Sequence, residues 1–306
     1  SDVCSSDLIS LRIWNQMNYG QDLVFGPRGG GIYYWSASVA TPLSVRGVAM
    51  NSLGGTVTMT IASPCVVTAT VALTEGAAVS FSTTGALPTG ITAGTTYYAY
   101  QVDGLTFKLL TAAGAVVNTS GTQSGTHSMT LVDVPTVQNV LTISDTSRFV
   151  FAMGCNDYAS ATLDPMLIRW SNQNDVYNWT PDATNQAGSV RLSHGSEIIS
   201  AIQTRQEIVV LTDSSVYSLQ YLGPPYVWGS QLLGDNISIA GPNAVAQANN
   251  VVYWMGVDKF YMYDGRVQTL NCDLRRYVFG DIDQGQFEQV YAGTNEGFNE
   301  VWWFYC

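Results

Sequence analysis

The sequence predicts an all-β protein: a β-propeller, partial in this chain, with an inserted small β-sandwich or β-barrel domain. The first observation is composition, since 46% of the 306 residues are hydrophobic and only 11% are charged, whereas Gly (29), Tyr (17) and Trp (8) are plentiful. This balance is typical of many short strands joined by tight turns, in a chain long enough to bury a full core. The second and third observations are a weak internal repeat and a change of composition within it.

The repeat consists of an apolar strand, a short turn and a second strand rich in aromatic residues. It occurs five times, as residues 22–25 with 31–35, 148–153 with 166–170, 207–211 with 215–221, 250–254 with 259–263, and 300–306, whose second half is absent. The starts at 22, 148, 207, 250 and 300 leave gaps of 126, 59, 43 and 50 residues. The last three gaps match the roughly 40 to 50 residues of a propeller blade, and the first is too long by one small domain.

The excess lies between Gly54 and Leu131, where Thr, Ser, Ala, Val and Gly dominate and Trp does not occur. Short strands alternate there with Gly and Pro turns, and a loop tolerates such an insertion best. Removing residues 56–131, a stretch of 76 residues, shortens the first gap to 50 residues. We therefore expect three segments: 9–55 as the first part of the propeller, 56–131 as an inserted β-sandwich-like module, and 132–306 as the continued propeller.

Local patterns predict a hairpin, a two-faced strand and a little helix. Asp264-Gly265 lies between two strand-like runs, which is the strongest short-range sign of a hairpin turn whose two residues both need φ above zero. In Val216–Tyr221, large apolar side chains alternate with Ser218 and Gln220, which predicts one packed face and one wetter face. The remaining expectations are a strand covered on both faces at 251–254 and helical turns at Asp273–Phe279 and Gln284–Val290.

Both ends of the chain are expected to be truncated. Residues 1–8 fit no pattern in the rest of the chain and are interpreted as translated adaptor sequence, while residues 300–306 resemble the middle of a strand. No stretch approaches the about 20 apolar residues that span a bilayer, and the first residues lack the features of a secretory signal. We therefore expect no membrane span.

The charge argues against a nucleic-acid or anionic-membrane binder, and the cysteine spacing argues against a metal site. Twelve basic and 23 acidic residues give a net charge of −11, unlike the basic surface of a nucleic-acid or anionic-membrane binder. A conduit through which DNA slides stays compatible, because an acidic wall does not hold phosphate. The cysteines are odd in number and lack the spacing of a metal site. They are interpreted as free thiols: Cys4, Cys65, Cys155, Cys272 and Cys306.

The sequence contains no recognisable catalytic set. His127 and His194 are its two histidines, and a Ser-His-Asp or Cys-His arrangement would have to combine the insert with the propeller. His194 is interpreted as a polar turn residue. HExxH, GxSxG, P-loop and GxGxxG motifs do not occur. We therefore expect no enzyme, no cofactor, and no catalytic or metal-binding residues.

Three weaker signals have structural explanations that we favour. Gly26–Gly31 offers backbone amides to an anion, but it lies between two strands and is expected to form a wide hairpin turn. Asp281, Asp283, Gly285 and Glu288 resemble a calcium loop but lack a third ligand and the distal glutamate spacing of an EF-hand. Glycoside hydrolysis needs two facing acids. The scattered candidates are expected to serve turns: Asp164, Asp175, Asp213 and Asp258.

Aromatic residues allow two interpretations. They could form a platform on which sugars stack, or they could fill the wedge between propeller blades, which is the interpretation that we favour. The residues concerned are Tyr33, Tyr34, Trp35, Trp170, Trp179, Trp228, Tyr253, Trp254, Trp302 and Trp303.

Short motifs spread over residues 16–48 and 134–306 carry a family resemblance. They include Asp164–Ser171, Trp179–Pro181, Ala183–Gly188, Thr204–Ile208, Ser218–Pro225, Gly241–Asn243, Tyr253–Gly256, Tyr263–Arg266 and Ala292–Asn295. This set resembles tailed-bacteriophage virion proteins, namely the tail hub, nozzle or packaged-DNA stabilisation proteins of short-tailed phages. The insert, with residues 83–97, is similar to a small β module that recurs in phage structural proteins.

The resemblance implies a homo-oligomeric ring, usually a hexamer, stacked below an adaptor and portal in the virion tail. The genome would be retained by this ring and leave through it, without sequence-specific DNA binding, after synthesis of the protein in the host cytoplasm. The family has no catalytic motif to carry over, and the insert suggests decoration or contact. Ring formation demands head-to-tail contacts that close. We expect the acidic residues to line the lumen.

Two other functions stay open. A receptor- or carbohydrate-binding propeller predicts an exposed aromatic patch with convergent polar groups. A glycan-cleaving enzyme requires two carboxyl groups about 5 to 9.5 Å apart in a cleft.

Overall fold

The computed structural model describes residues 12–37, 46–50, 55–70, 73, 75–158, 160–181, 183 and 185–306. Residues 1–8, which were interpreted as an artefact, lie outside the described residues. The chain divides into two compact units. The N-terminal unit contains Gln16–Asp164 and Ile168–Ser189, and the C-terminal unit contains Pro165–Leu167 and Val190–Cys306 together with the described residues up to Asn15. The insert lies in the N-terminal unit with the first sheets.

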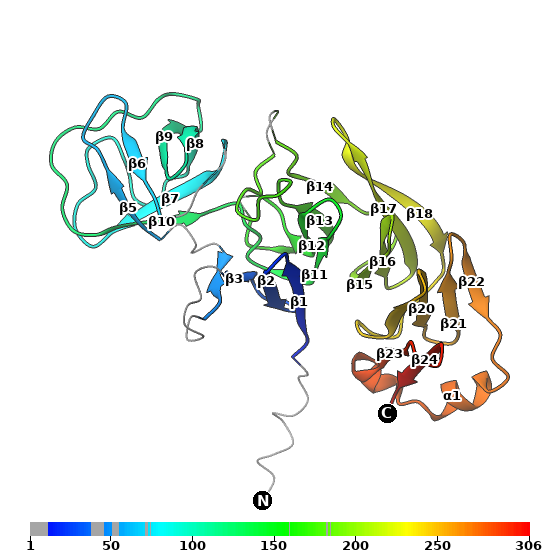
Figure 1. Ribbon diagram of the computed structural model, residues 1–306. Helices are drawn as coiled ribbons and strands as arrows, with labels where there is room; N and C mark the ends of the chain where they lie inside the picture. Colours follow the sequence, from blue (N-terminus) through cyan, green and yellow to red (C-terminus); the bar gives the residue numbers. More distant parts are fainter. Residues whose placement is uncertain are drawn as a thin grey trace, which may run out of the picture. The chain divides into compact units, whose positions relative to one another are not determined.

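Two four-stranded antiparallel sheets flank the insert along the chain (Figure 1). The strands of the first sheet follow one another in the order β1-β2-β3-β4, and those of the second in the order β11-β12-β13-β14. Their bounds are β1 Trp14–Tyr19, β2 Asp22–Pro27, β3 Tyr33–Trp35, β4 Val48–Ala49, β11 Gln138–Ser144, β12 Phe149–Asn156, β13 Leu163–Trp170 and β14 Gly188–Arg191.

The insert is a closed six-stranded barrel with strand order β10-β5-β6-β9-β8-β7, which decides between the two architectures that the sequence left open. Its strands are β5 Thr56–Met59, β6 Val66–Thr68, β7 Ala78–Thr83, β8 Tyr97–Asp103, β9 Thr106–Thr111 and β10 His127–Leu131. Buried and exposed positions alternate along β5 and β10, because one face of each strand points into the barrel. Phe81, Phe107 and Met129 are among the buried side chains that fill it.

The C-terminal unit contains two further four-stranded sheets and a two-stranded one, again in sequential order. They comprise β15 Ile198–Gln203, β16 Glu207–Thr212, β17 Ser215–Gly223, β18 Val227–Asp235, β19 Val245–Ala248, β20 Val251–Met255, β21 Phe260–Tyr263, β22 Val267–Leu270, β23 Tyr291–Asn295 and β24 Glu300–Phe304. Sequential four-stranded meanders are the blade units of propellers. The structure thus confirms an all-β fold of propeller type with an inserted barrel.

The repeated strand pairs of the sequence correspond to the middle of the sheets. They are β2 with β3, β12 with β13, β16 with β17, and β20 with β21, the second and third strands of four successive sheets. Middle strands lie between two partners and often between two packed faces, so they carry the longest apolar runs. The outer strands are shorter or more polar, which explains why the repeat is visible only in its centre.

Two short helices lie near the positions that the sequence predicted. The α-helix α1 spans Arg275–Asp281, which begins two residues after the expected start, and the 3-10 helix η2 spans Gln284–Gln289. No helix among the described residues has the length and apolar character needed to cross a membrane.

The hairpin turn between β21 and β22 exists, but its predicted type was wrong. Tyr263 pairs with Val267, so three residues rather than two form the loop. Gly265 has a φ of +110°, and the Asp264 carboxylate accepts a hydrogen bond from the backbone N–H of Arg266 at 3.3 Å. The aspartate thus stabilises a longer loop through its side chain, as Asx turns do.

The prediction of a wetter face on β17 was also wrong. Ser218 is fully buried, and Ser215 to Leu219 are all buried, whereas the strand becomes exposed from Gln220 onward. The cause is a neighbouring carboxylate: the Ser218 hydroxyl donates a hydrogen bond to Glu207. A small polar side chain with a partner can therefore occupy a covered face that a simple alternation rule assigns to solvent.

Candidate functional site

The two histidines serve local structure in different units. His127 is buried in the barrel, with Nδ1 2.8 Å from Thr83 Oγ1 and Nε2 3.1 Å from Gln123 Oε1. His194 lies in a turn of the C-terminal unit, half-exposed, with Nδ1 3.6 Å from Asp235 Oδ2. Neither imidazole contacts a serine or cysteine nucleophile in the hydrogen bonds that define its position.

Two of the four scattered acids, Asp175 and Asp213, serve turns as expected, whereas Asp258 forms an ion pair. Asp175 accepts a hydrogen bond from the backbone N–H of Tyr177 at 2.9 Å. Asp213 accepts hydrogen bonds from the backbone and side chain of Ser196, both at 2.7 Å. Asp258 binds Arg275 at 2.9 Å. The fourth acid, Asp164, lies inside β13 opposite Cys155 and so differs from the expected turn position.

Polar groups of the two suspected ion-binding loops form hydrogen bonds within the protein. In the loop between β2 and β3, the N–H of Gly29 donates to the Gln138 carbonyl at 2.7 Å and that of Gly30 donates to the Pro27 carbonyl at 3.0 Å. Asp283 caps η2 by accepting a hydrogen bond from the N–H of Gly285 at 2.9 Å. Among the described residues, no three His, Cys, Asp or Glu side chains gather as metal ligands do.

The four cysteines in the described part of the chain are free thiols: Cys65, Cys155, Cys272 and Cys306. Cys4 lies outside the described residues. Burial raises the pKa of the Cys155 thiol to about 12, and burial also raises the pKa of Cys65. Since the thiolate is the reactive form, burial disfavours the reactive state of both groups.

Five of the ten aromatic residues considered above are buried in the core, as the favoured interpretation predicted. Trp179 and Trp254 are almost completely buried, and the Trp254 indole donates to the Ser238 carbonyl at 3.2 Å and stacks on Tyr261 with ring centroids 5.4 Å apart. Tyr34, Trp170 and Trp228 are also buried, whereas Trp302 is half-exposed.

A carboxylate cluster that the sequence did not reveal links two sheets of the C-terminal unit. Glu207 on β16 accepts hydrogen bonds from Ser218, from Gln220 Nε2 at 3.0 Å and from Tyr263 Oη at 2.6 Å. Burial favours a higher pKa for Glu207, but the hydrogen bonds from Ser218, Tyr263 and Gln220 outweigh it and lower the pKa below its usual value. The donors come from residues 11 to 56 positions away, so no short motif could have signalled the cluster.

A buried cation in the N-terminal unit was missed for the same reason. Arg169 on β13 is 1% exposed. Its guanidinium donates to the carbonyls of Asn156, at 3.0 Å, and Asp133, and lies 3.9 Å from the centre of the Tyr158 ring. These contacts stabilise a charge inside the sheet, while the buried Nε of the same guanidinium has no hydrogen-bond partner among the described residues. Arg169 therefore has a structural role.

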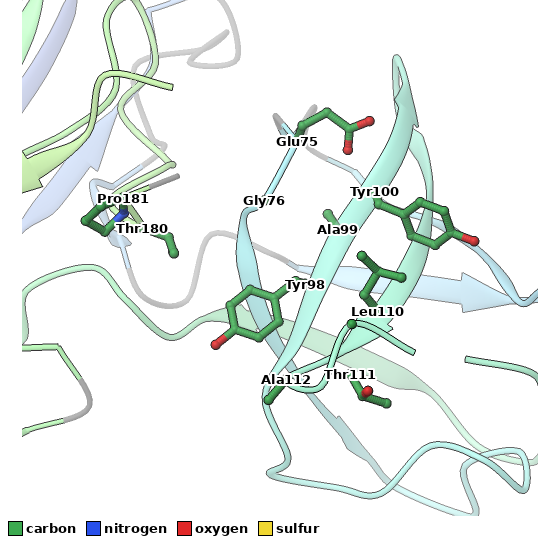
Figure 2. A pocket seen from close by; sticks show the side chains of 11 residues that line it. Glu75, Gly76, Tyr98, Ala99, Tyr100, Leu110, Thr111, Ala112, Thr180 and Pro181 are labelled. Carbon is green, nitrogen blue, oxygen red and sulfur yellow. The ribbon is translucent and has the colours of Figure 1, made fainter. Parts of the chain in front are cut away.

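A groove lies in the N-terminal unit, beside the barrel (Figure 2). Tyr98 and Tyr100 on β8 and Leu110 on β9 stand on the outer face of the barrel, because Tyr98 pairs with Leu110 and Ala99 between the tyrosines points into the core. Glu75, Thr180 and Pro181 complete the lining of a cavity of about 650 Å³. Asn178 anchors the lining by donating to the Glu75 carbonyl at 3.2 Å.

The groove is lined by aromatic, small apolar and a few polar side chains. Its lining combines two phenol rings, small apolar side chains and one exposed carboxylate, Glu75. The hydroxyl of Thr180, one of the lining residues, donates a hydrogen bond to Asp133 Oδ2 at 2.5 Å.

Comparison with known proteins adds little to these observations. No family model and no curated protein matches the chain. A solved structure described as the crystal structure of BBS1N in complex with ARL6DN, soaked with mercury, is similar over 84% of this chain and 79% of that chain, with 9% sequence identity and a TM-score of 0.30. At that level the likeness carries no argument, and the fold rests on the strand order and register described above.

Proposed function

We propose that this protein is a structural subunit of a bacteriophage tail, a hub or nozzle protein that forms a homo-oligomeric ring, a hexamer, below the adaptor and portal. The ring would retain the packaged genome and conduct it during ejection, and DNA would pass through the lumen without sequence-specific binding. The net charge of −11 supports a wall that does not hold phosphate. The polar groups suspected of catalysis serve turns and caps, which also suits a structural role rather than an enzyme.

One observation carries the assembly proposal: the hairpin of β17 and β18 extends past its own sheet (Figure 1). The last pair between β16 and β17 is Glu207 with Gln220, yet β17 and β18 continue to pair as far as Gly223 with Val227. We call residues 221–228 the β17–β18 arm. An isolated two-stranded ribbon has only marginal stability.

Apolar side chains at the tip of this arm face solvent. Leu222 is 58% exposed and Tyr226 is 77% exposed. Exposed apolar groups on a projecting ribbon mark a protein contact, and a ring is built from such heterologous contacts when they close. We infer that the β17–β18 arm packs on the next subunit.

Native mass spectrometry and negative-stain images of the purified protein test this proposal. We expect a closed ring with a central channel, and we expect the double substitution Leu222→Ser with Tyr226→Ser to yield smaller species. Leu105→Ser is the matched control, because Leu105 is 47% exposed but lies in a barrel turn, so its ring should persist. A protein that stays monomeric at high concentration contradicts the proposal.

The charge argument has its own test. The acidic residues should line the lumen of the ring, and an electron-microscopy structure with a basic lumen contradicts this part of the proposal.

A second function, binding of a receptor or carbohydrate, is favoured by a different observation. Tyr291, Trp302 and Phe304 expose their rings on one face of the β23–β24 hairpin. Carbohydrate titration of the purified protein tests this function independently of ring assembly.

A further inference from the structure

The two faces of the β23–β24 hairpin have opposite environments. On the inner face, Ala292 is buried, and the Trp303 indole donates to the Ala244 carbonyl at 3.0 Å and lies 5.0 Å from the Phe260 ring. On the outer face, Tyr291 is 57%, Trp302 50% and Phe304 56% exposed. The inner face alone fixes the hairpin to the C-terminal unit, so the outer aromatic residues are not needed for that packing.

Gly293 has no side chain, and this leaves a slot between these rings. Gly293 pairs directly with Trp302, and a Cβ at Gly293 would meet only the Tyr291 ring, at 3.8 Å. The resulting slot has a volume of about 190 Å³ and is lined by Gly293, Thr294, Asn295, Trp302 and Phe304. The Trp302 and Phe304 rings lie 6.2 Å apart at an angle of 48°. The rings of Trp302 and Phe304 therefore border the slot on one strand, and the backbone at Gly293 forms its base.

Glu300 is hydrogen-bonded to two of the residues that line this slot, Asn295 and Trp302. Glu300 Oε2 accepts hydrogen bonds from the Trp302 indole at 2.9 Å and from Asn295 Nδ2 at 3.5 Å. These bonds hold the indole in one orientation, which lowers the entropy cost of binding a ligand against it. An ionised carboxylate has about four acceptor sites, so Glu300 can also accept hydrogen bonds from hydroxyl groups of a ligand.

We propose that this slot binds one neutral hexose unit of an oligosaccharide. The apolar C–H face of a hexose packs on the Trp302 ring, while its hydroxyl groups bond to Glu300 and Asn295, which matches an amphipathic ligand to an amphipathic surface. The Glu300 carboxylate and the net charge of −11 disfavour uronates, sialates and phosphorylated sugars. The inference rests on the carbohydrate-binding function proposed above and is independent of ring assembly.

Titration of the purified protein with maltohexaose, cellohexaose and chitohexaose tests the proposal, with binding followed by calorimetry and by tryptophan fluorescence. We expect at least one of these neutral probes to bind. Trp302→Ala should weaken that binding by about tenfold or more, which equals about 1.4 kcal/mol, and Gly293→Val should weaken it by filling the slot while every aromatic ring stays in place. Trp14→Ala is the matched control, because Trp14 is 52% exposed outside the slot; its affinity should be unchanged.

Three outcomes overturn the proposal, and they have different meanings. If none of the probes binds at millimolar concentration, both the slot and the carbohydrate-binding function fail. If a probe binds but Trp302→Ala and Gly293→Val leave its affinity unchanged, carbohydrate binding stands and its place in this slot fails. If no probe binds and Trp302→Ala lowers the native mass, the aromatic face is a contact between copies of the chain. A circular dichroism spectrum like that of the unsubstituted protein shows that each variant is folded.

Discussion

The barrel and the four-stranded sheets bury their apolar side chains in different ways. Barrel strands such as β9 alternate between buried and partly exposed residues, whereas all eight residues of β12 are buried. A closed sheet encloses its own core, so each strand needs only one apolar face. An open sheet buries both faces only when other elements cover them. The barrel therefore encloses a core of its own, and each sheet depends on its neighbours.

This difference decides where polar groups occur. The barrel places most of its hydroxyl groups on the outside, while a covered sheet must supply a partner for every polar group inside it. Arg169 between backbone carbonyls and Glu207 between Ser218 and Tyr263 are such cases. More of the buried polar groups therefore lie in the sheets, although the barrel also buries His127 with Thr83 and Gln123 as its partners.

The largest expected effects come from one core deletion in each region. Phe107→Ala in the barrel and Trp254→Ala in the fourth sheet should each lower the free energy of unfolding by about 3 to 5 kcal/mol, since Phe107 is 1% and Trp254 0% exposed. Hydrogen exchange should show the Phe107→Ala effect within the barrel only. The Trp254→Ala effect should extend through the sheets that share its core with Val209 and Tyr263.

The distinction between the barrel and the sheets is wrong if Phe107→Ala speeds hydrogen exchange in the C-terminal unit as much as in the barrel. Such a result would mean that the barrel is not a self-sufficient folding unit.

A smaller effect is expected at the carboxylate inside the sheets. Glu207→Gln should lower stability at neutral pH by about 2 kcal/mol, because hydrogen bonds to a charged group are worth about 1.5 to 3 kcal/mol. The folded pKa of Glu207 lies below the reference value of 4.5, so its contribution is complete above that value and is lost as the pH falls through the folded pKa. The stability difference between the two proteins should therefore narrow with acidification.

Urea unfolding at a series of pH values measures this difference. Ser80→Ala is the barrel control: Ser80 Oγ lies 2.8 Å from Thr130 Oγ1, a pair without an ionisable group, so its effect should not vary over the same range. A Glu207→Gln effect that is constant with pH contradicts the ionised cluster.

Replacing a turn glycine by alanine should lower the stability by a still smaller amount, which differs between the two regions. Gly265 has a φ of +110° and Gly104, in the β8–β9 turn of the barrel, has a φ of +59°. Nothing lies within 4 Å of a Cβ at either position, so alanine introduces backbone strain without a clash. L-residues adopt the conformation of Gly104 more easily than that of Gly265. We therefore expect the free energy of unfolding to fall by about 1 to 2 kcal/mol in Gly265→Ala and by about 1 kcal/mol or less in Gly104→Ala. Equal losses in thermal unfolding would show that the two turns do not differ in this way.

Surface charges should not distinguish the two regions. Asp258→Asn removes ion pairs with Arg275 at 2.9 Å and Lys259 at 3.8 Å, in which all three side chains are roughly half-exposed. Lys108→Met in the barrel removes a hydrogen bond to Gln101 Oε1 at 2.5 Å. Each change should cost less than about 1 kcal/mol, and the first should shrink further in high salt. A larger loss at Asp258 would show that this surface site supports the sheet.

Much of the fold could be predicted from the sequence, because the signals that define it are local. Apolar runs identify the middle strands of the sheets, and the altered composition of 56–131 identifies the barrel. The turn at Gly265 was predicted in place but not in type, since the choice between two and three loop residues depends on the register of Tyr263 with Val267. Register is a property of two strands and cannot be seen in one of them.

The candidate site was less predictable. The Glu207 cluster joins residues from three strands, and the barrel groove joins β8 and β9 to Thr180. Trp302 stood among ten similar aromatic residues, and only the partner strand, with Gly293 opposite its ring, distinguishes it from a core tryptophan. Composition identified the residue types, while spatial pairing decided which of them face solvent.

The barrel is joined to the chain at a single place. Its first and last strands pair directly, with Thr56 opposite Ser128, and the N–H of Met129 donates to the Gly55 carbonyl at 2.8 Å. The polypeptide therefore arrives and departs through neighbouring positions, so excising the module leaves a gap that a short peptide can bridge. Such an arrangement makes the barrel an exchangeable module: recombination can replace it with another small domain while the sheets stay the same.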